Sequence, residues 1–307
     1  MSDAKKTTHD SDEDPRNLNT QVYVNGALFH RDEAKVSVYD SGFMLGDGMW
    51  EGLRLYNGKW LFFDAHMDRF FGSCAAVSLD VGMDRAGILA ALNMTAKANG
   101  MTTDAHCRLM LTRGTKVKPF QHPSLSRTGP TLVIIMEHSK PSAGLQTGIR
   151  LATVPQVRGL PMSQDAKYNS HSKLNCVLAC LQAEQVGADE GLMLDPHGFV
   201  NTTNACNFFI VRKGAVWTST GDYCMNGVTR QTVIDICRDN DIPVFERNYS
   251  LFETYSADEA FITGTFGAQT PVSDIDGRAI GTGDRPVMDR IRALYKDLIT
   301  AETGATF

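Results

Sequence analysis

Asp165-Ala166-Lys167 opens the stretch of sequence that decides the fold, and Gly227-Val228-Thr229-Arg230 closes it. Between them, residues 174–179 have the apolar spacing of a helix, and the runs 191–195 and 207–211 have the composition of buried strands. The closing residues begin a second helix. Helices and strands are mixed here without the strict βαβ alternation of a doubly wound sheet, so we expect an α+β fold.

The sequence before this stretch predicts a smaller domain. Asn25-Gly26 and Asn57-Gly58 suit tight turns, and each lies between two strand-like runs. Asp64 is expected to cap a helix, and a second helix is expected over 88–98. The other strands expected in this half are 108–112 and 131–136, with a loop over the site between them at 114–130.

Composition places the domain boundary. Residues 1–19 are polar and aperiodic and predict a disordered tail. We expect a smaller N-terminal α+β domain over 20–140, a linker near 137–148, and a larger C-terminal domain over 149–307. The elements expected in the C-terminal domain are strands at 149–154, 191–195, 207–211, 243–246 and 259–263, and helices at 173–186, 228–239 and 286–301.

The overall balance of residue types excludes several classes of protein. The chain has 307 residues, 42% hydrophobic and 21% charged, with a net charge of −5. It lacks a long basic cluster, which argues against nucleic acid as a partner. Its apolar runs are too short to span a bilayer, and we expect a cytoplasmic protein. The seven cysteines form no C-x-x-C pair, which indicates free thiols, and the histidines suggest no metal site.

Two lysines compete for a catalytic role. A lysine that forms an imine must be neutral part of the time and so needs partial burial. Lys167 ends an extended segment. Lys173 begins a helix, and its side chain is expected beside a buried helix face and exposed to solvent. The residues expected on that buried face are Leu174, Val177, Leu178 and Leu181. Helix register therefore favours Lys167, with Lys173 as the alternative.

Three segments could bind an anion together. Gly227-Val228-Thr229-Arg230 offers free backbone N–H groups at a helix start, together with a threonine hydroxyl. Thr263-Gly264-Thr265 ends a strand and can add another hydroxyl. Arg69, alone on an otherwise apolar helix, can pair with a phosphate. The glycine-rich run 42–54 lacks the spacing of a P-loop and reads as a tightly packed strand entry.

These pieces, in this order, resemble the class IV (fold type IV) pyridoxal-phosphate enzymes over roughly residues 21–300. That family includes branched-chain aminotransferases, D-amino-acid aminotransferases, R-selective amine transaminases and aminodeoxychorismate lyase. The motifs that carry the resemblance are Gly46-Asp47-Gly48-Met49-Trp50-Glu51-Gly52, His66-Met67-Asp68-Arg69, Leu178-Ala179 with Gly187–Glu190, Asn207–Val211, Gly227–Arg230, and Thr263–Thr265 with Pro271-Val272.

The resemblance implies a cofactor, pyridoxal 5′-phosphate, and a homodimer of two-domain subunits. Lys167 would be the Schiff-base lysine, and the substrate side would carry Arg108, His106 and Lys118. The residues that would surround the cofactor phosphate are Arg69, Val228, Thr229 and Thr265.

One position departs from the family pattern. Relatives place a glutamate where it holds a proton on the pyridine nitrogen of the cofactor, and this chain has Thr202 there. A neutral hydroxyl favours that proton less than a carboxylate does. We therefore expect less stabilisation of carbanion charge on the cofactor ring than in ordinary relatives.

The function implied is amino transfer between an amino acid and a 2-oxo acid, with branched-chain L-amino acids as the first choice. Alternatives are a D-amino-acid or R-amine transaminase, and a lyase or racemase on the same cofactor. A non-catalytic scaffold is the alternative from another class.

Overall fold

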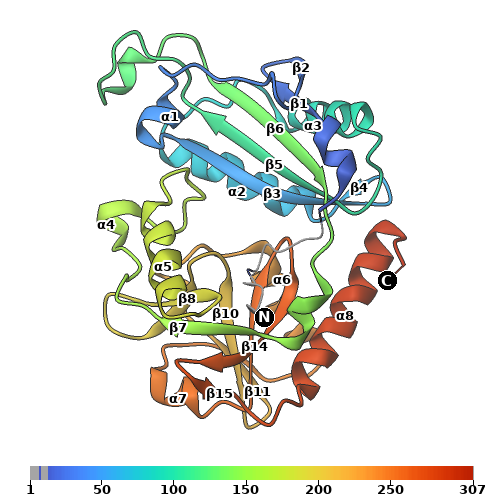
Figure 1. Cartoon of the computed structure of the whole chain (residues 1–307), viewed down its shortest axis with the longest axis vertical. Helices are drawn as coiled ribbons and strands as arrows, with labels where there is room; N and C mark the ends of the chain where they lie inside the picture. The colour runs from blue at the N-terminus through green and yellow to red at the C-terminus, as the bar shows by residue number, and fades with distance from the viewer. Residues whose placement is uncertain (1–6, 8–12, 307) are drawn as a thin grey trace.

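The chain folds around two sheets, one in each half of the sequence (Figure 1). The computed structural model describes residue 7 and residues 13–306, so most of the tail expected at 1–19 lies outside the described residues. The structure matches the α+β prediction. Each half contains both helices and strands, and antiparallel strand pairs occur in both sheets. Among the described residues, no helix is both long and apolar enough to cross a lipid bilayer.

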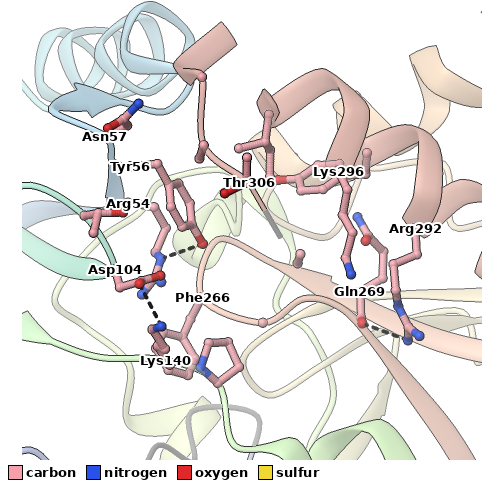
Figure 2. Close-up of a pocket in the computed structure, with 18 of the residues that line it drawn as sticks. Arg54, Tyr56, Asn57, Asp104, Lys140, Phe266, Gln269, Arg292, Lys296 and Thr306 are labelled. Atoms are coloured by element: carbon pink, nitrogen blue, oxygen red, sulfur yellow. Dashed lines mark hydrogen bonds and ion pairs between the residues drawn. The ribbon is translucent and has the colours of Figure 1, made fainter. Parts of the chain in front are cut away.

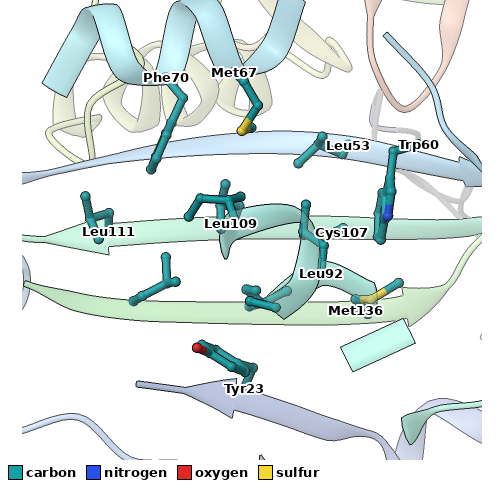
Figure 3. Packing of buried hydrophobic residues seen from close by; sticks show 14 of the residues in the cluster. Tyr23, Leu53, Trp60, Met67, Phe70, Leu92, Cys107, Leu109, Leu111 and Met136 are labelled. Carbon is teal, nitrogen blue, oxygen red and sulfur yellow. The ribbon is translucent and has the colours of Figure 1, made fainter. Parts of the chain in front are cut away.

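The N-terminal sheet is antiparallel, with the strand order β2-β1-β6-β5-β3-β4. Its strands are β1 (Gln21–Val24), β2 (Ala27–His30), β3 (Gly48–Tyr56), β4 (Lys59–Trp60), β5 (Ala105–Thr112) and β6 (Thr131–His138). The helices α2 (Phe63–Ala76) and α3 (Arg85–Ala98) bring apolar side chains such as Phe70 and Leu92 onto Leu109 of β5 (Figure 3). The opposite face of this sheet is turned toward the C-terminal half (Figure 1).

The C-terminal sheet is mixed, with the order β12-β11-β10-β13-β14-β7-β8-β9 and β15 paired to β14. Its strands are β7 (Ile149–Thr153), β8 (Glu190–Leu194), β9 (Val200–Thr203), β10 (Asn207–Arg212), β11 (Ala215–Thr218), β12 (Val244–Glu246), β13 (Glu259–Gly264), β14 (Ala268–Ile275) and β15 (Arg278–Ala279). The β7–β8, β7–β14 and β11–β12 pairs are parallel.

Helices of the C-terminal half cover this sheet. α6 (Val228–Asp239) and α8 (Pro286–Thr303) bury apolar side chains against the stacked rings of Phe209 and Phe261. α5 (Leu174–Gln185) packs on β7 and β8. The shorter helices are α1 (Ser41–Leu45), α4 (Pro161–Gln164) and α7 (Leu251–Tyr255), with 3-10 turns at Pro15–Asn19, Pro123–Leu125 and Ala143–Thr147.

Two local predictions are wrong. Residues 15–19 are ordered rather than part of a tail, because Asp14 caps a 3-10 turn and Asn17 exchanges two hydrogen bonds with the backbone of His138, at 2.8 and 2.9 Å. Asp64 does not cap α2. The cap position is Phe62, and Asp64 lies in the first turn, where its charge still suits the helix dipole.

The helix face expected to be buried on α5 is exposed. Leu174, Val177, Leu178 and Leu181 retain between 39% and 71% of their accessible surface. The sheet is contacted instead by the small residues of α5, and a Cβ added at Gly191 would lie 2.8 Å from the carbonyl oxygen of Ala179. Small side chains thus bring this helix close to β8 and leave its large apolar side chains outside.

Candidate active site

The segment before α5 pairs with the free edge of β3. The backbone N–H of Trp50 donates to the carbonyl of Asn169, and that of His171 donates to the carbonyl of Gly48, both at 2.9 Å. The Trp50 indole N–H adds a bond to the carbonyl of Ser170 at 3.2 Å. Residues 169–171 therefore act as a short extra strand that joins the two halves of the chain.

Glycines make this close pairing possible. Gly46 has φ of 67°, and a Cβ there would lie 2.6 Å from the Ser172 hydroxyl. A Cβ at Gly48 would lie 2.5 Å from the carbonyl of Leu111 on the neighbouring strand. The glycine-rich run is thus the tightly packed strand entry that the sequence predicts. Because its glycines lack side chains, the backbone before α5 can approach closely.

Lys173 is consequently placed over the cleft face of the N-terminal sheet. Its Nζ lies 6.0 Å from the ring centroid of Trp50, and the guanidinium carbon of Arg108 lies 4.0 Å from the same centroid. Burial lowers the pKa of Lys173 to about 8, and the positive charges of Arg158, Arg69 and Arg108 act in the same direction. Near neutral pH a substantial fraction of this amine is therefore uncharged.

Lys167 lies elsewhere. Its side chain is exposed, and its backbone N–H donates to the Asp165 carboxylate two residues earlier, which closes a local turn. The structure does not bring it to the arginines around Lys173. The preference for Lys167 rests on a buried apolar face of α5, and that face is exposed.

A buried carboxylate organises one wall of the cleft. Glu51 is fully buried, accepts two bonds from Arg69 at 2.6 and 2.8 Å, and contacts Nδ1 of His66 at 2.8 Å. Burial alone would raise the pKa of Glu51, but the charge and hydrogen bonds of Arg69 and the contact with His66 bring it below its usual range. Arg69 is thereby held in one orientation.

Arg69 reaches the start of α6. Its Nη1 donates to the carbonyl of Asn226 at 3.2 Å, immediately before Gly227 and Val228. Thr229 is buried in the first turn of α6 and is hydrogen-bonded to Tyr295. Arg69 therefore lies beside the free N–H groups of this helix start, the arrangement that the sequence predicts for binding an anion.

The turn after β13 adds hydroxyl groups. Thr265 is half-buried in this turn, and the buried Thr263 hydroxyl has no hydrogen-bond partner among the described residues. An orphaned buried hydroxyl is satisfied when a ligand oxygen occupies the site.

Thr202 is buried in β9, opposite Asn207 of β10. Its hydroxyl donates to the carbonyl of Cys206. Arg158 lies close by, donating to the carbonyl of Thr203 at 2.6 Å and to the Cys176 sulfur at 3.5 Å. A threonine and an arginine, rather than a carboxylate, therefore lie at this position of the C-terminal sheet.

The predicted substrate-side residues separate into two groups. Arg108 and His106 lie on the same face of β5, and His106 contacts the ring of Phe266 edge-on, with centroids 5.6 Å apart. Lys118 is exposed in the 114–130 loop, and its side chain is not brought to the arginines of the cleft.

Sequence reasoning assigned no role to Arg158, and it left Trp50 open between contact with a hydrophobic substrate and core packing. Trp50 lies inside one of the family motifs. It is on β3, close to Arg108 of the paired strand β5, and that position could have indicated a place in the site. Arg158 had no such signal, because its partner groups are a backbone carbonyl and a thiol from distant segments.

Other chemistry finds little support in the part of the chain that the structure describes. No group of three or more metal-ligating side chains gathers there. In the described part of the chain, Cys74, Cys107, Cys224 and Cys237 are buried and form no disulfide.

The two-sheet fold brings a half-buried lysine, arginines and a helix start together, an arrangement suited to an anionic ligand. The amino-transferase class IV family matches residues 48–275, and the chain belongs to that family. This membership and the α+β fold confirm the resemblance seen in the sequence.

Known proteins resemble the chain over most of its length. It is 39% identical to the branched-chain-amino-acid aminotransferase-like protein 1 of Arabidopsis thaliana, over 94% of this chain and 52% of that protein, so it spans about half the length of this relative. It is 31% identical to the branched-chain-amino-acid aminotransferase of Pseudomonas aeruginosa, over 92% of this chain and 94% of that protein. The D-alanine aminotransferase of Listeria monocytogenes is also 31% identical, over 92% of this chain and 98% of that protein.

Solved structures have the same fold. The branched-chain aminotransferase of Thermoproteus uzoniensis with norvaline superposes with a TM-score of 0.82 at 29% identity, covering 92% of this chain and 96% of that one. An aminotransferase of Brucella abortus bound to pyridoxal phosphate superposes with a TM-score of 0.80 at 25% identity, covering 91% of this chain and 98% of that one.

The buried carboxylate gives a pH-dependent prediction. Replacing Glu51 with Gln leaves the Arg69 charge without its partner and should lower the free energy of unfolding by about 3 kcal/mol at neutral pH. The folded pKa of Glu51 is depressed, so its contribution is fully present above the unfolded value near 4.5 and is lost as pH falls through the folded pKa. The difference between wild type and Glu51→Gln, measured by urea unfolding, should therefore shrink on acidification below 4.5.

The matched control is Asp289→Asn, which removes an exposed partner of Arg292 and should change the unfolding free energy by less than about 1 kcal/mol. A Glu51→Gln difference that stays constant or grows at acid pH would show that the Glu51 charge does not stabilise the fold.

Proposed function

We propose that this chain is a pyridoxal-phosphate-dependent aminotransferase that moves an amino group between an amino acid and a 2-oxo acid, and that Lys173 is its catalytic lysine. The observation that carries the proposal is the environment of Lys173, a half-buried amine whose pKa is lowered to about 8 beside Arg69 and Arg108. An amine that is partly neutral near physiological pH can form an imine with an aldehyde.

The residues of the cleft fit the phosphate of this cofactor. The N–H groups at the start of α6, the Arg69 guanidinium and the Thr265 hydroxyl would bind it, and the unpartnered Thr263 hydroxyl is available beside them. Glu51 compensates only Arg69, so the charges of Arg108, Arg158 and Lys173 leave the cleft positive toward an anion. The bound cofactor would supply the electron sink that makes the Cα–H bond of an amino acid acidic.

Lys173 would then act as the proton carrier. Its Nζ, positioned over the Trp50 ring, would accept the proton released from Cα of the amino acid and become an ammonium group, and would later donate that proton back to the bound group, which restores the neutral amine. Attachment at the cap position of α5, whose preceding segment is paired to β3, limits how far the amine can move.

Arg108 is proposed to bind the substrate carboxylate. It extends from β5 over the Trp50 ring, and the indole offers an apolar surface for a hydrocarbon side chain. Branched-chain L-amino acids remain our first choice of donor, supported by the branched-chain relatives. D-alanine is the second, because a D-alanine aminotransferase matches over nearly its whole length.

The lysine assignment is tested with a pair of variants. Lys173→Ala should reduce oxo-acid exchange at least about 100-fold and abolish the visible absorbance of covalently bound cofactor, whereas Lys167→Ala should retain both. L-leucine, L-valine and D-alanine are offered as donors in each assay, with L-leucine expected to be the fastest. Loss of activity and absorbance in Lys167→Ala alone would reassign the lysine, and a colourless wild type that transfers no amino group would overturn the proposed function.

Thr202 makes a separate spectroscopic prediction. Because its hydroxyl donates to the Cys206 carbonyl and no carboxylate replaces it, a cofactor ring nitrogen at this position would lack an acidic partner. We expect the long-wavelength absorbance of carbanion charge on the ring to be weak in wild type during turnover and stronger in Thr202→Glu. An intense, long-lived band in the wild-type protein would show that another group protonates the ring. Thr203→Ser, which keeps a hydroxyl at the neighbouring position, is the control.

A homodimer is proposed from the exposed face of α5. Val177 and Leu181 are 51% and 48% exposed on one side of this helix, and Leu174 and Leu178 extend the same apolar surface. Exposed apolar surface of this extent is typical of interfaces, and a second copy of the chain presents an identical surface that a two-fold axis can pair with it.

Sedimentation velocity tests this assembly. The double variant Val177→Asp, Leu181→Asp should sediment as a monomer at a concentration at which wild type is a dimer, because burying two carboxylates in an apolar interface is costly. Phe252→Asp, on an exposed position of α7, should leave the dimer intact. A wild-type protein that sediments as a monomer would contradict the proposal.

A further inference from the structure

A second cavity lies beside the proposed active site. It has a volume of about 710 Å³ and is enclosed by the end of β3, the turn between β13 and β14, residues 140–146 and the last turns of α8 (Figure 2). None of Lys173, Arg69 and Thr229 lines it. The two spaces adjoin, because Tyr295 of the cavity is hydrogen-bonded to Thr229 and Gln269 lies opposite Thr263 in the β13–β14 pair.

The cavity contains a buried amide with no partner. Gln269 is only 2% exposed, and neither its side-chain oxygen nor its side-chain nitrogen is hydrogen-bonded in the described structure. Its backbone carbonyl accepts a bond from Arg292 at 3.5 Å, which places the base of its side chain beside α8. Buried carboxamides are nearly always satisfied in folded proteins, so this amide indicates a ligand that supplies its hydrogen bonds.

The charge of the lining is positive. Four basic side chains face one acidic side chain, and Lys140 already pairs with that residue, Asp104, at 2.9 Å. Arg292 is paired with Asp289 at 3.3 Å outside the lining. Lys296, one turn further along α8, forms no ion pair among the described residues, and Figure 2 shows it directed into the same space as Gln269. An unpaired ammonium group in this position favours an anion.

The remaining wall is aromatic and apolar. Arg54 is buried at the opposite end, with its guanidinium carbon 5.1 Å from the ring centroid of Tyr56 and 5.4 Å from that of Phe266. Tyr295 and Ile299 of α8 contribute further apolar surface. A volume of this size suits a small organic molecule rather than a lone ion.

We propose that this cavity is a binding site for a small organic anion, in which Lys296 binds a carboxylate or phosphate group, Gln269 hydrogen-bonds to the same group, and the Tyr56 and Phe266 rings contact the organic body. Because Lys173, Arg69 and Thr229 do not line the cavity, its ligand is expected to bind alongside pyridoxal phosphate.

Calorimetric titration of the cofactor-loaded protein tests this site. The probes are phenylacetate, phenyl phosphate and the neutral benzamide, in a buffer without carboxylate or phosphate. One or both anions should bind, and benzamide should bind at least roughly tenfold more weakly. Tighter binding of phenylacetate or of phenyl phosphate assigns a carboxylate or a phosphate ligand, respectively.

Variants locate the binding. Lys296→Met and Gln269→Leu should each weaken the binding of the anion roughly tenfold or more, whereas Lys97→Met on the exposed end of α3 should not. Gln269→Leu should also raise the unfolding midpoint of the ligand-free protein, because it removes an unsatisfied buried amide. Anion binding that is unchanged in both cavity variants, or absent in wild type, would overturn the site. Lys173→Ala reports on the proposed aminotransferase function independently of these results.

Discussion

The pairing of residues 169–171 with the free edge of β3 is the constraint on which the site depends. Two backbone hydrogen bonds of 2.9 Å fix the register between a segment of the C-terminal half and the first residues of β3, Gly48 and Trp50. That register determines that α5 begins at Leu174 and that Lys173 lies over Trp50. Without it, Lys173 would not be held beside Arg69 and Arg108, because the lysine and these two arginines come from separate halves of the chain.

The region around Lys173 has more basic than acidic side chains. Glu51 is the carboxylate that the structure places in this wall, and it is committed to Arg69 and His66. The charges of Arg108 and Arg158 then act on Lys173, together with burial, in the direction that lowers its pKa. Burial is the main cause of the lowered pKa of Lys173, and the same positive charges that assist it would also attract the phosphate and the carboxylate of the proposed function.

The sequence predicted where helices and strands lie better than it predicted which residues they contact. Asn-Gly turns and apolar periodicity located both N-terminal hairpins and, within a few residues, helices such as α6, because these signals are local. Arg69 and the α6 start were also recognised, since an arginine and a glycine-threonine helix start have a recognisable chemistry. The preference between the two lysines depended on an assumption about which face of α5 is buried. Periodicity shows that a face is apolar but not what covers it, and here small alanines contact the sheet while the leucines are exposed.

The exposed face of α5 also points to a link between assembly and the site. Lys173 is the cap residue of α5, and the apolar side chains that begin one residue later are those proposed to meet a second copy of the chain. A helix that packs on its own sheet only through small side chains, with Ala179 against Gly191, gains little burial from that contact. Burial of the opposite face between two copies would hold the helix start, and with it the amine, in one position. The local sequence of α5 is therefore consistent with two demands, in which small residues allow a close approach to β8 and large ones are left on the face of the proposed dimer interface.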